Sequence, residues 1–288
     1  MFIGVLPERA HLFQPEPRSE VAVNDAAAWR LNPAHRSVYD KLGVALAAGL
    51  RAAPCGVDPL AFGLEPDDWV FVKPIVNLAG MALQARAVRA DAVPNDPGLF
   101  WCERLEGEHT STDCLVREGE VVWLTHTSAS ERKDRARPLY WDVGVERPEL
   151  DARVRDWVGR HLAGYTGLCN LEMIGGRPIE AHLRGSNGFL ELYGPAFVPA
   201  WVALMDGESF QAPPPVPGGL VLSLFGAGSL TDAQTALISA AGAVSRLDPH
   251  TSDRIAVILC PDKARGLELI ERLGSLGCTP SVPAPETP

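Results

Sequence analysis

The residues best suited to chemistry lie in the segment 170–184, which reads NLEMIGGRPIEAHLR. Two short segments rich in apolar residues flank the dipeptide Gly175-Gly176. A glycine pair between two such segments predicts a β-hairpin, because glycine tolerates the backbone angles of a tight turn. The hairpin would carry two glutamates, a histidine and an arginine.

These charged side chains are predicted to meet on one side of the hairpin. Successive side chains of a strand point to opposite faces, so Glu180, His182 and Arg184 would share a face, and the turn can bring Glu172 to it. Two converging carboxylates repel each other unless a cation lies between them. A divalent metal carrying a polyphosphate supplies that cation, and arginine suits the phosphate oxygens. A hairpin whose polar residues face water is the alternative reading.

Length and composition are those of a soluble globular protein. The 288 residues include 46% hydrophobic and 22% charged residues, and the net charge of −10 argues against broad nucleic-acid binding. No apolar run is long enough for a membrane span, and the start of the chain lacks the order of a secretory signal. The cysteines form no C-x-x-C pair, which favours reduced thiols in a cytoplasm; they are Cys55, Cys102, Cys114, Cys169, Cys260 and Cys278.

Segments of helix and strand pattern surround the hairpin. Residues 37–50 and 150–162 predict helices, and residues 69–74 predict a strand that ends on Lys73-Pro74. Residues 99–105 predict another strand, and residues 110–125 a second hairpin. After a Pro/Gly-rich stretch, the alternation of strand and helix patterns predicts a βαβα unit.

Several common catalytic motifs are missing. The sequence has no G-x-x-x-x-G-K-[ST] for a P-loop, no G-x-S-x-G and no H-E-x-x-H. The string FGAG at 225–228 lacks the third glycine of a dinucleotide fingerprint and suits a tight strand-to-helix turn. Phosphate chemistry without a P-loop needs lysines from separate elements, a mobile glycine loop and carboxylates for a metal.

The chain presents those parts in the order of one known design. They are Lys41, Lys73, Gly80, Glu172 and Glu180. Over about residues 32–205 the sequence thereby resembles the ATP-grasp superfamily, which includes biotin carboxylase and D-alanine–D-alanine ligase. The resemblance implies an α/β (α+β) fold of two subdomains that clasp ATP between antiparallel sheets.

The resemblance also assigns nucleotide-binding roles. Lys41, opening a helix after Asp40, and Lys73 would hold phosphates, and Gly80 would lie in the flexible loop above them. The segment 100–105 is similar to the hinge that cradles adenine. The candidate hinge and ribose ligands are Glu103, Leu105, Glu108 and His109.

Metal and catalytic roles follow from the same comparison. Glu172 and Glu180 match the two carboxylates that hold Mg²⁺, and Arg184 matches the arginine of the E-x-N-x-R signature. His182 stands where the family has asparagine. As a direct ligand it would suit Mn²⁺ better than Mg²⁺, and as a hydrogen-bond donor it would serve a phosphate. Lys73, His182 and Arg184 are therefore the candidate catalytic residues.

The implied function is an ATP-dependent ligase that joins a carboxylate to an amine or a thiol through an acyl phosphate, releasing ADP and phosphate. Its partners would be a small-molecule or peptide carboxylate and the nucleophile, with no nucleic acid and no membrane, and a homo-oligomer stays open. The alternatives are a small-molecule kinase of the same fold and a nucleotide-binding regulatory protein without catalysis.

The domain organisation predicted from these patterns has five parts. They are an N-terminal arm at 1–31, the ATP-grasp domain at 32–206, a linker at 207–219, the βαβα unit at 220–278 and a disordered tail at 279–288. The arm is shorter than the α/β domain that precedes the fold in the family, so the C-terminal unit or a partner chain would have to replace that domain.

Overall fold

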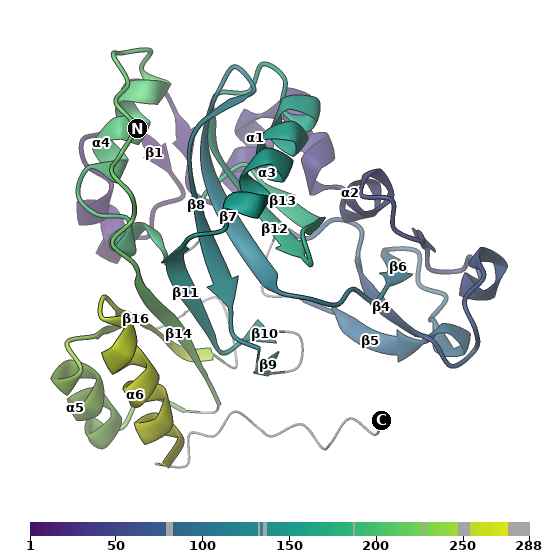
Figure 1. The fold of residues 1–288 in the computed structure, drawn as a ribbon. Coiled ribbons are helices and arrows are strands. Elements are labelled where there is room, and N and C mark those ends of the chain that lie inside the picture. Colours follow the sequence, from purple (N-terminus) through teal and green to yellow (C-terminus); the bar gives the residue numbers. More distant parts are fainter. Residues whose placement is uncertain are drawn as a thin grey trace. The chain divides into compact units, whose positions relative to one another are not determined.

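The fold was analysed in a computed structural model (Figure 1) that describes residues 1–78, 83–131, 133–134, 137–186, 188–226, 228–246 and 254–275. Contacts divide the chain into two compact units, and each is described by itself. Unit 1 comprises Met1–Leu124, Arg147–Gly185 and Val198–Ala212. Unit 2 comprises Thr125–Glu146, Ser186–Phe197 and Pro213–Pro288. Among the described residues, no helix has the length and apolar character needed to cross a bilayer.

Unit 1 contains most of the regular elements. Its strands are β1 (Phe2–Ile3), β2 (Val21–Ala22), β3 (Ala52–Pro54), β4 (Trp69–Pro74), β5 (Arg86–Arg89), β6 (Leu99–Glu103), β7 (His109–Arg117), β12 (Gly167–Ile174) and β13 (Arg177–His182), together with the first half of β8 (Glu120–Ala129). Its α-helices are α1 (Asp25–Leu31), α2 (Lys41–Ala47), α3 (Pro148–His161) and all but the first residue of α4 (Phe197–Met205).

A four-stranded antiparallel sheet of order β3-β6-β4-β5 forms one layer of unit 1. Its strands alternate in the expected way, because Trp101 packs into one apolar cluster and Phe100 into another. Helix α2 contributes Ala45 to the cluster that contains Phe100. Asp40 caps α2, since its Oδ1 accepts from the Gly43 amide at 3.0 Å.

A second antiparallel layer of unit 1 has the strand order β13-β12-β7-β8. Helix α3 packs on one face of it (Figure 1), with buried residues at i, i+4, i+7 and i+8. The core there includes Trp157 of α3, Leu171 and Met173 of β12 and Ala181 of β13. The opposite face of the same strands therefore carries the alternate residues of β12 and β13.

The N-terminal arm is ordered and belongs to unit 1. Strands β1 and β2 pair in parallel, and Asn24 caps α1 by accepting from the Ala27 amide at 2.8 Å. Ala27 and Ala28 join the core beneath α3. Phe2 packs on Trp201 of α4, with 4.9 Å between ring centroids.

Unit 2 is built on antiparallel strands in the order β8-β11-β14-β16-β15. Its elements, besides the second half of β8, are β9 (Lys133–Asp134), β10 (Arg137–Pro138), β11 (Tyr140–Val145), β14 (Gly219–Phe225), α5 (Asp232–Ala240), β15 (Val244–Arg246), β16 (Arg254–Cys260) and α6 (Lys263–Ser275). The two helices pack on the strands around Leu222, Ile238, Ile258 and Leu269. A capping box between Thr231 and Gln234 begins α5.

The two units differ from the expected domain boundaries. Residues 125–146 and 186–197 lie in the unit that holds the C-terminal elements, because β11 pairs with β14 along residues 140–143. The break at Ala212 and Pro213 falls inside the expected linker. The C-terminal elements also include the three-residue strand β15, which the βαβα pattern lacks. The expected tail at 279–288 lies outside the described residues.

Candidate nucleotide and metal site

The predicted hairpin is formed by β12 and β13. Glu172 lies directly opposite Glu180, and Asn170 lies opposite His182. Gly175 and Gly176 form the turn, both with positive φ (57° and 73°), as a tight hairpin turn requires. The two glutamates thus share the sheet face that points away from α3.

Basic groups compensate this pair of carboxylates. Lys41 Nζ lies 2.6 Å from Glu180 Oε1, and His182 Nε2 lies 3.0 Å from the same oxygen. His109 Nε2 lies 3.0 Å from Glu172 Oε2. Like charges directly opposite each other in a sheet are destabilising, so the site depends on these basic partners.

Both carboxyl groups are held in the ionised form. Burial by itself would raise the pKa of Glu180, but His182 and Lys41 outweigh it and hold that pKa far below the usual range. Burial likewise opposes ionisation of Glu172, and the hydrogen bond and charge of His109 lower its pKa overall. The face therefore presents two anions beside several cations.

The two predicted lysines converge on β13 from separate elements. Lys73, at the end of β4, donates through Nζ to the carbonyl of Ile179 at 3.0 Å. Lys41 begins α2, and its amide donates to the carbonyl of Ile75 at 2.9 Å, which ties the start of the helix to the end of β4. Burial lowers the pKa of Lys73. An ammonium group that gives up water in this way gains from an anionic ligand.

His182 is buried between two carboxylates. Its Nε2 faces Glu180, and its Nδ1 lies 3.0 Å from Asp25 Oδ1. Burial and the charge of Arg184 oppose protonation, but Asp25 and Glu180 raise the pKa of His182 overall. Both ring nitrogens thus have protein partners here, whereas the sequence suggested a metal or a phosphate as the partner.

Asp25 is a site residue that the sequence reading missed. Its Oδ2 accepts from Arg184 Nη2 at 2.8 Å and from Arg184 Nε at 3.1 Å. The available signal was an acidic residue inside the run VNDAAAW, where Asn24 already provides the helix cap. An acidic residue in the first turn of a helix is common because it suits the helix dipole, so this signal alone does not point to a buried partner.

The expected hinge residues lie next to the same hairpin. Glu103, at the end of β6, pairs with Arg51 and with Arg177 of β13, at 3.1 and 3.2 Å. Leu105 packs against the cluster around Phe100. The segment predicted to cradle adenine therefore lies beside the first residue of β13.

Glu108 and His109 were both expected at the ribose hydroxyls. The Glu108 carbonyl accepts from the Gly175 amide at 2.9 Å, and its carboxylate pairs with Arg147 at 2.5 and 2.8 Å. The Nε2 atom of His109 lies 3.0 Å from Glu172, so His109 is a neighbour of the two opposed carboxylates. Gly80 lies outside the described residues.

The residues that would hold a metal ion at this site are Glu172 and Glu180. Ionised carboxylate oxygens are the ligands that Mg²⁺ prefers, and they fit it in chemistry and charge. Within the ranges that the structure describes, no group of three or more His, Cys, Asp and Glu side chains is arranged to hold a metal ion. A Mg²⁺ ion held by Glu172 and Glu180 would complete its coordination with oxygens of a bound nucleotide and of water.

Comparison with known proteins gives matches in structure only. No protein-family model matches this sequence, and no curated protein sequence matches it. An L-amino acid ligase from Bacillus licheniformis has a TM-score of 0.61 and 15% identity, covering 93% of this chain and 81% of that chain. Phosphoribosylamine–glycine ligase from Thermotoga maritima has a TM-score of 0.59 and 13% identity, and the match covers 94% of this chain and 85% of that chain.

A third solved structure shares the fold and was determined with a nucleotide. N5-carboxyaminoimidazole synthase from Aspergillus clavatus, in complex with ADP and 5-aminoimidazole ribonucleotide, has a TM-score of 0.59 and 12% identity, covering 89% of this chain and 81% of that chain. The chain has the ATP-grasp fold. The fold class predicted from the sequence is confirmed.

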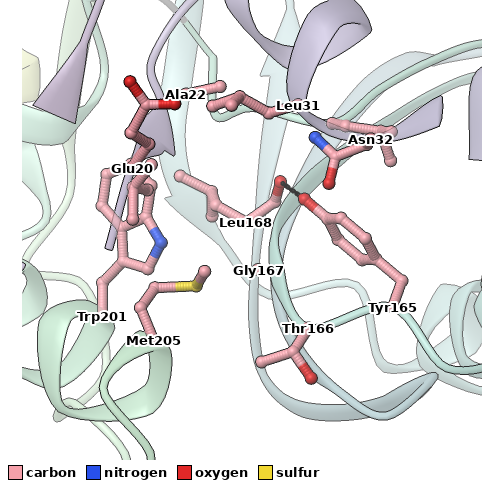
Figure 2. A pocket seen from close by; sticks show the side chains of 12 residues that line it. Glu20, Ala22, Leu31, Asn32, Tyr165, Thr166, Gly167, Leu168, Trp201 and Met205 are labelled. Atoms are coloured by element: carbon pink, nitrogen blue, oxygen red, sulfur yellow. Dashed lines mark hydrogen bonds between the residues drawn. The ribbon is translucent and has the colours of Figure 1, made fainter. Parts of the chain in front are cut away.

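A separate cavity lies in unit 1 (Figure 2). Its volume is about 120 Å³. Its lining residues include Glu20 of the arm, Asn32, Tyr165, and Trp201 and Met205 of α4. The Tyr165 hydroxyl donates to the Leu168 carbonyl at 2.9 Å. No residue of the predicted nucleotide and metal set lines this cavity.

Proposed function

We propose that this chain binds ATP with Mg²⁺ over the β12–β13 hairpin and uses it to join a carboxylate to an amine or a thiol. The observation that carries the proposal is the opposition of Glu172 and Glu180 on one sheet face, with lysines from two other elements directed to the same strand. Two carboxylates directly opposite each other destabilise a sheet relative to a neutral pair, so stability alone does not explain this arrangement. A ligand that carries a cation for the carboxylates and anionic groups for the lysines fits it.

Lys41 and Lys73 would bind phosphate oxygens of the nucleotide. Glu172 and Glu180 would hold Mg²⁺, which when bound neutralises charge on the β- and γ-phosphate oxygens. Glu103, Leu105 and the neighbouring residues would contact the base and ribose. These assignments are supported by the ATP-grasp fold and by the geometry of the hairpin.

The ligase class is supported by what the fold neighbours are. Two of them are named as ligases, one of L-amino acids and one of phosphoribosylamine with glycine.

We propose small-molecule substrates and a cytoplasmic location for this chain as well. Its five described cysteines are free, which suits a reducing compartment.

The proposed reaction has two steps. A substrate carboxylate oxygen attacks the γ-phosphorus, the bond to the β-phosphate oxygen breaks, and ADP leaves. The amine or thiol then attacks the acyl carbon, phosphate leaves with the bonding electrons, and the nucleophile loses a proton. Lys73, His182 and Arg184 would orient the reactants and stabilise negative charge on the transferred group, because catalysis in such sites is mostly positioning and charge neutralisation.

Product analysis tests this reaction class. Purified protein incubated with Mg·ATP and pooled acids and amines should release ADP and phosphate only when both an acid and a nucleophile are present. Hydroxylamine should replace the amine and give a hydroxamate, because it traps an acyl phosphate. The measurement is a coupled ADP assay with mass spectrometry of the product.

Other products would contradict the ligase proposal. AMP with pyrophosphate would indicate an acyl adenylate. A stable phosphate ester would indicate the kinase alternative. Tight binding of ATP without turnover in any pool would favour the regulatory alternative.

A further inference from the structure

The N-terminal arm contributes one buried carboxylate, Asp25, which contacts His182 at the end of β13 and Arg184 just after it. Asp25 is 5% exposed, and it lies between Asn24 and a run of three alanines, 26–28. One oxygen lies 3.0 Å from His182 Nδ1, and the other accepts from two nitrogens of Arg184. The contact joins residues 157 and 159 positions apart.

An acidic residue in the first turn of α1 suits the helix dipole, but that role requires neither burial of the residue nor a distant partner. Asn24 caps α1, so Asp25 is not needed for that purpose. Burial would raise the pKa of Asp25, but Arg184 and His182 outweigh it and keep the group ionised. A buried ionised group is costly unless it is paired, so this one requires both of its partners on the hairpin.

The contacts fix the orientation of both partners. Arg184 donates through Nε and Nη2 to Asp25 Oδ2 and through Nη1 to the Gly185 carbonyl at 3.0 Å, which sets the plane of its guanidinium. His182 is held at one ring nitrogen by Asp25 and at the other by Glu180. The series Arg184–Asp25–His182–Glu180 is therefore continuous from the arm to a proposed metal carboxylate.

We propose that Asp25 is a positioning residue, which holds Arg184 in the orientation in which it meets the terminal phosphate of the bound nucleotide and holds His182 against Glu180. The inference rests on the proposed function, since it concerns the same site. It assigns to the arm a part in the site, whereas the expected site residues all lie between Lys41 and Arg184. Asp25 acts through Arg184 and does not itself touch the nucleotide.

The test compares Mg·ATP with Mg·ADP, which lacks the terminal phosphate. In Asp25→Asn the affinity for Mg·ATP should fall about tenfold, because one charge-assisted contact is misaligned, while the affinity for Mg·ADP changes little. In an Arg184→Gln background, Asp25→Asn should cause no further loss. Glu20→Gln is the control, since it replaces an acid of the same arm whose side chain is 49% exposed. Calorimetric titration and a thermal melt of each variant supply the data.

A second measurement needs no ligand and no substitution at Asp25. In the unliganded parent, the Arg184 Nε–H should exchange with solvent far more slowly than that of Arg30, whose side chain is 57% exposed. Nitrogen-15 NMR detects both signals, and Arg184→Lys assigns the first by its loss. An Arg184 signal that exchanges as fast as that of Arg30 would overturn the proposal.

The outcomes separate this inference from the proposed function. Equal losses of Mg·ATP and Mg·ADP affinity in Asp25→Asn would show a merely structural role, and a gain in Mg·ATP affinity would show that Asp25 blocks the site. Either result overturns the positioning role and leaves the ligase proposal standing. Failure of the parent to bind either nucleotide overturns both.

Discussion

Replacement of Glu180 by glutamine is expected to lower ATP turnover about 10²- to 10³-fold, the usual cost of removing one preorganised group from a charged site. The substitution preserves shape and removes the charge that would hold Mg²⁺. Affinity for Mg·ATP should weaken as well. Stability should fall as well, because glutamine still accepts from Lys41 but no longer neutralises this buried cation, and a thermal melt separates that loss from the loss of turnover. Steady-state kinetics and titration of Mg·ATP provide the comparison.

The matched control for this substitution is Glu120→Gln. Glu120 begins β8 in the same unit and is exposed to solvent, so its loss should leave turnover unchanged. A Glu180→Gln variant that turned over Mg·ATP like the parent would show that the carboxylate pair does not hold the metal.

Replacement of Lys41 by methionine is expected to destabilise the protein by about 3–5 kcal/mol, because it leaves a buried carboxylate without one of its cations. Lys41 and Glu180 have side chains only 6% and 17% exposed, so solvent screens the pair weakly. Mg²⁺ should restore part of the lost stability by entering between the carboxylates. Urea denaturation with and without Mg²⁺ measures both effects.

Lys263→Met is the control for the stability measurement. Lys263 pairs with Asp142 in unit 2, and its side chain is 55% exposed, so its loss should cost at most about 1 kcal/mol. If the two variants lose the same stability, or if Mg²⁺ stabilises neither the parent nor Lys41→Met, the compensation that we describe at Glu180 is wrong.

The parts of the site that follow from local pattern were predictable. The glycine pair indicated the β12–β13 hairpin, and the period of two along each strand placed Glu172 and Glu180 on one face. Asp40 before Lys41 indicated a helix start, and the predicted strand at 69–74 coincides with β4. The resemblance to the superfamily showed that the order of these residues along the chain fits a nucleotide-binding site.

The parts that depend on distant pairing were not predictable. Asp25 reaches His182 across 157 residues, and no local pattern encodes such a contact. The pairing of β11 with β14 joins segments about eighty residues apart, so the sequence could not reveal that residues 125–146 belong with the C-terminal elements. His109 remains predicted at the ribose by resemblance, and its position opposite Ile174 of β12 also places its Nε2 3.0 Å from Glu172, a contact that the sequence did not indicate.

Binding of ATP with and without Mg²⁺ tests the central claim most directly. We predict that the parent protein binds ATP in the presence of Mg²⁺ and binds it much more weakly when EDTA removes the metal, because two ionised carboxylates at the site repel an uncomplexed triphosphate. Glu180→Gln should lose most of that dependence on the metal. Equal affinity in Mg²⁺ and in EDTA, or no binding at millimolar ATP, would contradict the account.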